Sequence, residues 1–142
     1  MSAAPTTPDR RTDRRRAVLW LGAVAYLAGY LIHSIRHIVH LIPQTPTPTL
    51  VLGSTGWLLA VVVVLAVRRD HPHAPHVLIA IGLFTGVMVL LVHLAPDWTP
   101  FNQPWRQHNA TFTMWFSLGA NAVGALIAAV AGAVALRMRP AR

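Results

Sequence analysis

The chain has 142 residues; 54% are hydrophobic and only 11% are charged. Soluble domains hold about a quarter charged residues, so this composition predicts a protein whose solvent is lipid. The sequence contains no Cys, which excludes disulfides, thiolate metal sites and cysteine nucleophiles. The formal net charge of +8 is a feature of nucleic-acid-binding proteins, but its distribution along the chain favours membrane topology and no nucleic-acid partner.

Residues 1–16 form a basic segment with several prolines, which we expect to be a disordered cytoplasmic tail. Four apolar segments follow, each about as long as a membrane-spanning helix, which needs roughly 17–25 residues. They cover about residues 17–42, 50–67, 76–95 and 111–136. The predicted fold is therefore all-α: a polytopic membrane protein with a four-helix transmembrane domain over 17–137 and a short tail over 138–142.

The arginines predict the orientation of this bundle. Most of them precede the first apolar segment, lie between the second and third, or follow the fourth. Only Arg36 and Arg106 fall elsewhere. Because positively charged loops stay on the cytoplasmic side, we expect both termini in the cytoplasm. The protein is then integral to the plasma (inner) membrane, with the lipid bilayer as its first partner.

Histidines mark one face of the first apolar segment. At 100° per residue, His33, His37 and His40 fall within a narrow arc, and Tyr30 extends the same stripe. Ionisable residues inside a membrane are costly and usually face a protein interior or a wet cavity. The stripe therefore predicts a functional site.

Two other segments carry matching polar faces. Ser117 and Asn121 lie on a polar stripe of the fourth segment, and His93 ends a small-residue face of the third. Counting the helical rise from the flanking prolines places His93 level with His40, and Asn121 level with His33. We expect an outward-facing, histidine-lined pocket, and the residues predicted to line it besides the histidines are Tyr30, Arg36, Ser117 and Asn121.

Imidazole is the commonest metal-binding side chain, so this pocket predicts a transition-metal site for copper or zinc. The predicted ligands are His37, His40 and His93. His33, Asp97 and His108 are secondary candidates, of which Asp97 or His108 is the candidate fourth ligand. The absence of Cys and Met at the predicted pocket disfavours Cu(I).

A b-type haem is the second use of the same face. His37 or His40 could supply one axial ligand and His93 the other, while Arg36 and Arg106 pair with the propionates. No Cys-x-x-Cys-His motif occurs, which excludes covalent haem attachment.

Other interpretations stay open from the sequence. The chain could be a noncatalytic subunit or scaffold of a larger membrane complex, or a homo-oligomer, because Gly82 and Gly86 form a small-xxx-small pair. It could also be a small transporter or proton-relay component, although no acidic residue lies within the predicted helices. The 96–110 connection is a candidate lid over the pocket. No motif identifies an enzymatic reaction.

Overall fold

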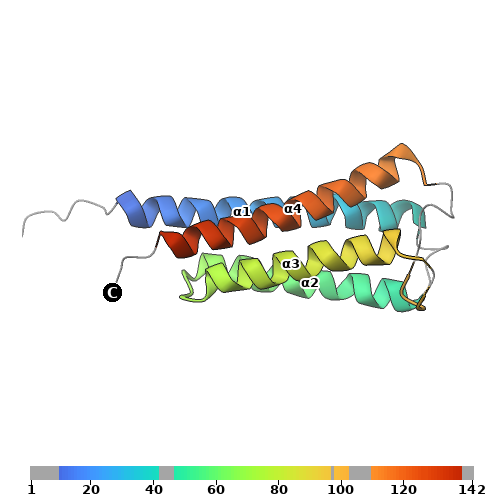
Figure 1. Cartoon of the computed structure of the whole chain (residues 1–142), viewed down its shortest axis with the longest axis horizontal. Coiled ribbons are helices and arrows are strands. Elements are labelled where there is room, and N and C mark those ends of the chain that lie inside the picture. Colours follow the sequence, from blue (N-terminus) through green and yellow to red (C-terminus); the bar gives the residue numbers. More distant parts are fainter. Residues whose placement is uncertain (1–9, 42–46, 97, 103–109, 139–142) are drawn as a thin grey trace, which may run out of the picture.

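The computed structural model describes residues 10–41, 47–96, 98–102 and 110–138, and their main feature is four long helices (Figure 1). These are α1 (Arg10–Arg36), which continues into the π-helical turn η1 (His37–Leu41), α2 (Thr47–Arg68), α3 (Ala74–Leu94) and α4 (Phe112–Arg137). All four are long and apolar enough to cross a membrane. The predicted all-helical bundle of four helices, each long and apolar enough to span a membrane, is therefore confirmed.

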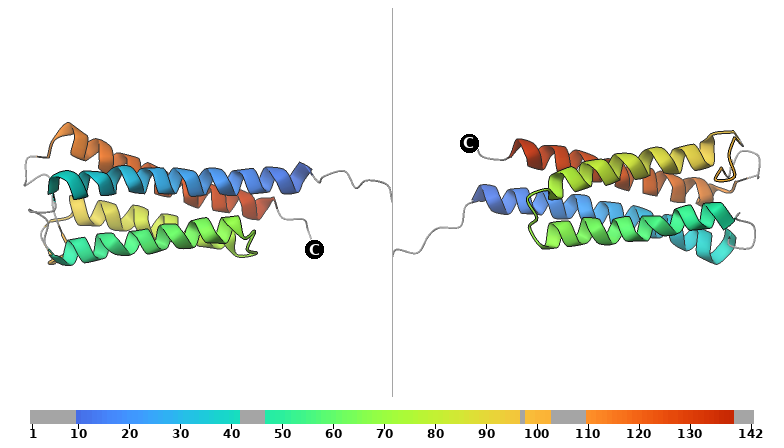
Figure 2. Two further views of the ribbon diagram at one scale, coloured as in Figure 1. Left: turned by 180° about the vertical axis from the view of Figure 1, so that it is seen from behind. Right: turned by 90° about the horizontal axis from the view of Figure 1, so that it is seen from below.

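The helices alternate in direction around the bundle. Helix α1 packs beside α2 and α4, and α3 also packs beside α2 and α4, so that α1 and α3 face each other diagonally (Figures 1 and 2). The start of α1, the end of α4 and the α2–α3 turn share one end of the bundle, which we call the terminal end. The opposite end, the site end, is where α1 and α3 finish.

The first helix differs from its predicted form at both ends. It begins at Arg10, within the segment expected to be a tail, because arginine is a good helix former and Asp13 lies in the first turn. At the other end the α-helix stops at Arg36 and η1 follows. A π-turn has a longer repeat than an α-helix, so the angular pattern assumed in the sequence does not extend beyond Arg36.

Glycines bring α1 and α4 into close contact. A side chain at Gly29 would meet the backbone of Ala120 and Asn121, and one at Gly124 would meet the backbone of Ala25. Small residues at a membrane helix interface let two backbones approach and pack by van der Waals contact. The α1–α4 pair is accordingly the most extensive contact in the bundle.

The small-residue pair on α3 is used inside the chain. Gly82 lies against the backbone of Ala125 and Ala129, and Gly86 faces the side chain of Ala125. The face that the sequence offered to a second copy or another subunit is thus covered by α4 of the same chain.

Candidate metal centre

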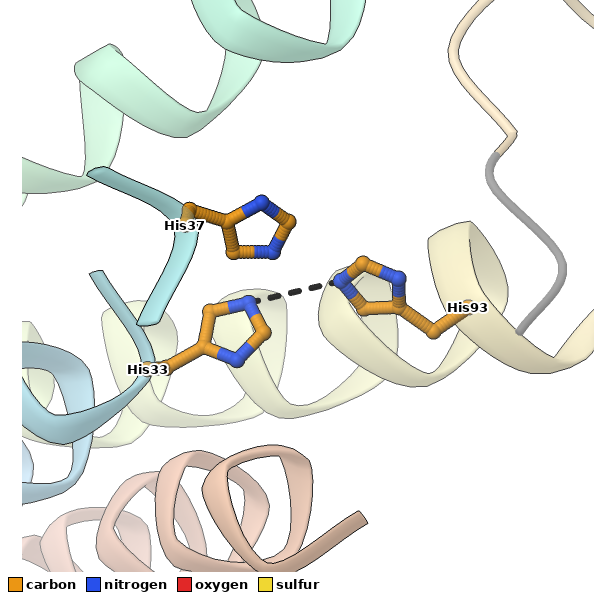
Figure 3. Close-up of side chains that lie close together, drawn as sticks. All are labelled: His33, His37 and His93. Carbon is orange, nitrogen blue, oxygen red and sulfur yellow. Dashed lines mark hydrogen bonds between the residues drawn. The ribbon is translucent and has the colours of Figure 1, made fainter. Parts of the chain in front are cut away.

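Three histidine side chains converge near the site end of the bundle. His33 from α1, His37 from η1 and His93 from α3 each offer a ring nitrogen, and these three atoms lie within 4.8 Å of one another (Figure 3). The Nε2 atoms of His33 and His93 are 3.3 Å apart, which is a hydrogen bond in which the tautomer decides the donor. We call these three residues the histidine trio.

The rings pack face and edge as well as through their nitrogens. The centroid of His33 lies 4.7 Å from that of His37 and 5.1 Å from that of His93. The His37 and His93 rings are stacked, with centroids 5.4 Å apart. His93 is 2% exposed and His33 is 8% exposed, so two of the three imidazoles are buried inside the bundle.

Two helices and the π-helical turn position the trio. His33 lies in the last turn of α1 and His37 begins η1, and the centroids of their rings are 4.7 Å apart. His93 lies in the last turn of α3 and meets them across the diagonal of the bundle. The backbone of Ser117 on α4 lies close to the His33 ring. The hydrogen bond between the rings of His33 and His93 thus joins α1 to α3.

A pocket of about 360 Å³ adjoins the trio. All four helices contribute to its wall, and α4 does so through Asn121. Tyr30 forms one side: its hydroxyl donates to the carbonyl of Gly53, and its ring meets Trp57 edge-on with centroids 5.2 Å apart. Gly56 leaves the space that the Tyr30 ring fills.

The structure brings together some of the predicted site residues. His33, His37 and His93 converge, and Tyr30 and Asn121 line the adjoining pocket. The depth comparison had paired His93 with His40, whereas the ring beside His93 is that of His33. Depth counted from each helix end assumes that both ends stand at one height, but α1 continues into η1 beyond the level at which α3 ends.

Arg36 and Ser117 are not among the described residues that line this pocket. Arg36 lies on the flank of α1 that faces α4, where its guanidinium donates to the hydroxyl of Thr111 at 3.3 Å. The Ser117 hydroxyl donates to the carbonyl of Met114 in its own helix. The side chain of His40, and Asp97, Arg106 and His108, lie outside the described residues.

Sequence reasoning missed part of the pocket. Met88 on α3 and Trp57 on α2 both line it. The presence of Met88 corrects the argument against Cu(I), because that argument assumed a pocket without a thioether. Thr85 and His93 mark the side of α3 turned to the pocket, but the other α3 residues that line it are apolar like the rest of the helix, so hydropathy does not single out Met88.

Comparison of the chain with family models, with curated proteins and with solved structures found no match. The geometry of the site is therefore the basis for assigning a function.

Proposed function

We propose that this membrane protein binds one transition-metal ion, zinc or copper, through His33, His37 and His93. The main observation that supports this proposal is that one ring nitrogen from each of the three residues lies within 4.8 Å of the others. In a tetrahedral site with metal–nitrogen bonds of about 2.0–2.1 Å, neighbouring ligand atoms lie about 3.3 Å apart. The Nε2 atoms of His33 and His93 are 3.3 Å apart, which matches this separation.

The donor set supports a borderline metal. Neutral imidazole suits zinc and copper, and three protein ligands leave a fourth position for water or a substrate. The pocket lies beside the trio, where a fourth ligand can reach the ion. His40, Asp97 and His108 remain our candidates for a fourth protein ligand.

The arrangement favours an ion over a haem. Two axial histidines face each other across the iron, and the porphyrin occupies the plane between them. Each pair within the trio has the third imidazole within 4.8 Å of both its ligand atoms. A porphyrin between any two of these rings would collide with the third.

Elemental analysis of the purified protein in detergent tests the proposal, with a visible spectrum recorded on the same sample. We expect about one zinc or copper per chain and no Soret band. His33→Gln and His93→Gln should each lower the bound metal severalfold while the helical circular dichroism is retained. His76→Gln is the matched control, because His76 is an exposed histidine of α3 at the terminal end. Equal metal content in wild type and in both trio variants, or a Soret band, would overturn the proposal.

We also propose that both termini are cytoplasmic and that the site end faces outward across the inner membrane. The support is the arginine distribution under the positive-inside rule. Because the chain has no native Cys, single cysteines can be introduced as Trp98→Cys at the site end and His71→Cys at the terminal end. In intact cells a membrane-impermeant maleimide should label the first and spare the second. The reverse pattern would invert the topology.

A further inference from the structure

A groove between α1 and α4 near the site end takes no part in the proposed metal site. The residues that line it include Ile32, Ile35 and Arg36 of α1, Val39 of η1, and Thr113 and Phe116 of α4. Ile35, Val39 and Phe116 are between 49% and 62% exposed. In a bundle whose helices span the membrane, such exposed apolar side chains face lipid. An occupant of this groove is therefore drawn from the lipid side of the bundle.

One residue of the groove, Arg36, carries a charge. Its Nη2 atom donates to Oγ1 of Thr111 at 3.3 Å, and this contact lies at the exposed surface, whereas its Nε atom is buried. Oγ1 of Thr111 lies 3.0 Å from Oγ1 of Thr113. The groove thus presents a guanidinium and two hydroxyls at the site end. The planar fork of N–H donors on an arginine matches the oxygens of a phosphate group.

No described acidic residue balances this charge. The described acids are Asp13, in the first turn of α1, and Asp70, in the α2–α3 turn, and both lie at the terminal end. A charged side chain at the membrane without a counterion is costly. The ion proposed at the histidine trio is a cation as well, so it adds to the positive charge at the site end. Both charges favour an anion in the groove.

The polar and apolar parts of the groove follow one another along the helices. Arg36 contacts Thr111, the residue before α4, so the guanidinium is level with the start of that helix. Ile32 lies one turn farther from the site end on α1, and Phe116 one turn farther on α4. With 26 residues, α4 is about 39 Å long, whereas the hydrocarbon core of a bilayer is about 30 Å thick. The first turn of α4 therefore reaches the headgroup level, and the groove is polar where headgroups lie and apolar where acyl chains lie.

This order of polarity is that of a phospholipid in the leaflet at the site end. We propose that the groove binds an anionic glycerophospholipid, with its phosphate at Arg36 and an acyl chain along Ile32 and Phe116. A zwitterionic headgroup would bring a second cation beside the arginine, where no described acid receives it, so a headgroup with net negative charge is favoured. Free phosphate would leave the apolar part of the groove unfilled. The inference goes beyond the proposed function, since the groove and its arginine exist without an ion at the trio.

Two matched pairs of variants separate the charge from the groove. Arg36→Gln removes the charge and keeps an N–H donor, and Arg137→Gln does the same to an exposed arginine in the last turn of α4, at the terminal end. Ile32→Trp places a large side chain in the groove. Leu31→Trp is its control, because Leu31 is 41% exposed against 40% for Ile32 but is not among the described lining residues.

The experiment measures photo-crosslinking of the protein in phosphatidylcholine vesicles to a trace of one of two lipid probes. Both probes carry the same diazirine acyl chain; one is a phosphatidylglycerol and the other a phosphatidylcholine. Digestion with pepsin and mass spectrometry then count the crosslinks at residues 32–39 and 112–117, which border the groove.

One arginine beside an anionic lipid is worth a preference of about fivefold. We therefore expect about fivefold more crosslinking by the phosphatidylglycerol probe than by the phosphatidylcholine probe in wild type, Arg137→Gln and Leu31→Trp. In Arg36→Gln the two probes should crosslink equally. Ile32→Trp should lower crosslinking by the phosphatidylglycerol probe severalfold, with helical circular dichroism confirming the fold.

Three results would overturn the proposal outright: equal crosslinking by both probes in wild type, an unchanged preference in Arg36→Gln, or unchanged crosslinking in a folded Ile32→Trp. A preference lost equally in Arg137→Gln would also overturn it, because the charge of the whole bundle would then attract the lipid. If Ile32→Trp fails to fold, the arginine pair still decides. An excess of sn-glycerol 3-phosphate should leave crosslinking intact, and competition by it would reject the lipid in favour of a soluble phosphate.

The same crosslinking on metal-free protein, with elemental analysis alongside, keeps this inference apart from the metal site. A phosphatidylglycerol preference at the groove in a protein that takes up no metal would support the lipid site and reject the ion. Metal uptake through the trio without that preference would do the opposite.

Discussion

The chain contains two groups of three histidines, and their ring nitrogens are arranged differently. We call His71, His73 and His76 the loop histidines: the first two lie in the α2–α3 turn, His76 lies in the first turn of α3, and all three are exposed. The histidine trio comes from α1, η1 and α3, which are distant in sequence. The loop group is denser in sequence, yet among the described residues it is the trio whose ligand atoms converge within 4.8 Å.

The difference lies in what holds the rings. Successive loop rings have centroids 5.5 and 5.8 Å apart, and the backbone N–H of His73 donates to Nδ1 of His71, so one ring nitrogen serves the local turn. Exposed imidazoles can be satisfied by water. In the trio, helix packing sets each ring, and His93 is almost fully buried. Packing across the bundle therefore does more to build a ligand set than closeness along the chain.

The largest expected effect is on stability in the presence of metal. An ion that binds only the folded state stabilises it by about 2.7 kcal/mol at 100 times its dissociation constant. We expect this gain in wild type and in the triple variant His71→Gln, His73→Gln, His76→Gln, and its loss in His93→Gln. Thermal unfolding in detergent, with and without added zinc, measures it. If the stabilisation by added zinc disappears in the triple variant, the ion binds the loop histidines and not the histidine trio.

A second prediction tests whether distant packing positions the trio. Gly124→Leu would push its side chain into the backbone of Ala25 and shift α1 against α4. Overpacking costs typically about 1–3 kcal/mol, and we expect the free energy of unfolding to fall by that amount, with reduced metal uptake. Gly119→Leu on the same helix enters open space and replaces a helical glycine. It should leave metal uptake unchanged and stability equal or higher.

The same contrast explains how far the sequence could lead. Hydropathy and prolines predicted four spans whose bounds differ from the structure by only a few residues, except at the start of α1. Periodicity put His33 and His37 on one face, and it identified Asn121 and His93 as polar members of other helices. These inferences depend on local regularity, which lipid enforces because every backbone group must be paired within its helix.

What the sequence could not provide was relative height and rotation. His33 was a secondary ligand in the prediction because helix ends were taken as level, and the structure sets His93 beside it. The position of Met88 was equally hidden, since apart from Thr85 and His93 the pocket-lining residues of α3 are apolar like the rest of that helix. Both quantities follow from how side chains of different helices fit together.

A smaller effect is expected deeper in the bundle, on the terminal side of the trio. The Tyr26 hydroxyl and Oγ1 of Thr85 are 2.9 Å apart and buried, joining α1 to α3 along the diagonal that also joins His33 to His93. Hydrogen bonds between membrane helices average about 0.6 kcal/mol. Tyr26→Phe should lower the free energy of unfolding by about that much and leave metal uptake intact. Loss of the metal together with the hydroxyl would mean that this bond sets the register of the trio.

The smallest expected effect is that of an ion pair beside the α2–α3 turn, close to the loop histidines. Arg16 on α1 pairs with Asp70 at 3.3 Å, with both side chains more than half exposed, and so ties the α2–α3 turn to the first helix. Exposed ion pairs contribute about 0–1 kcal/mol, so Arg16→Ala should change the free energy of unfolding by no more than that. Salt should erase even this change, because exposed charges are screened. Chemical unfolding at low and high salt measures this change. A larger fall in the free energy of unfolding would show that the α2–α3 turn holds the terminal end together more firmly than an exposed ion pair suggests. The loop histidines would then be held more rigidly than their exposure indicates.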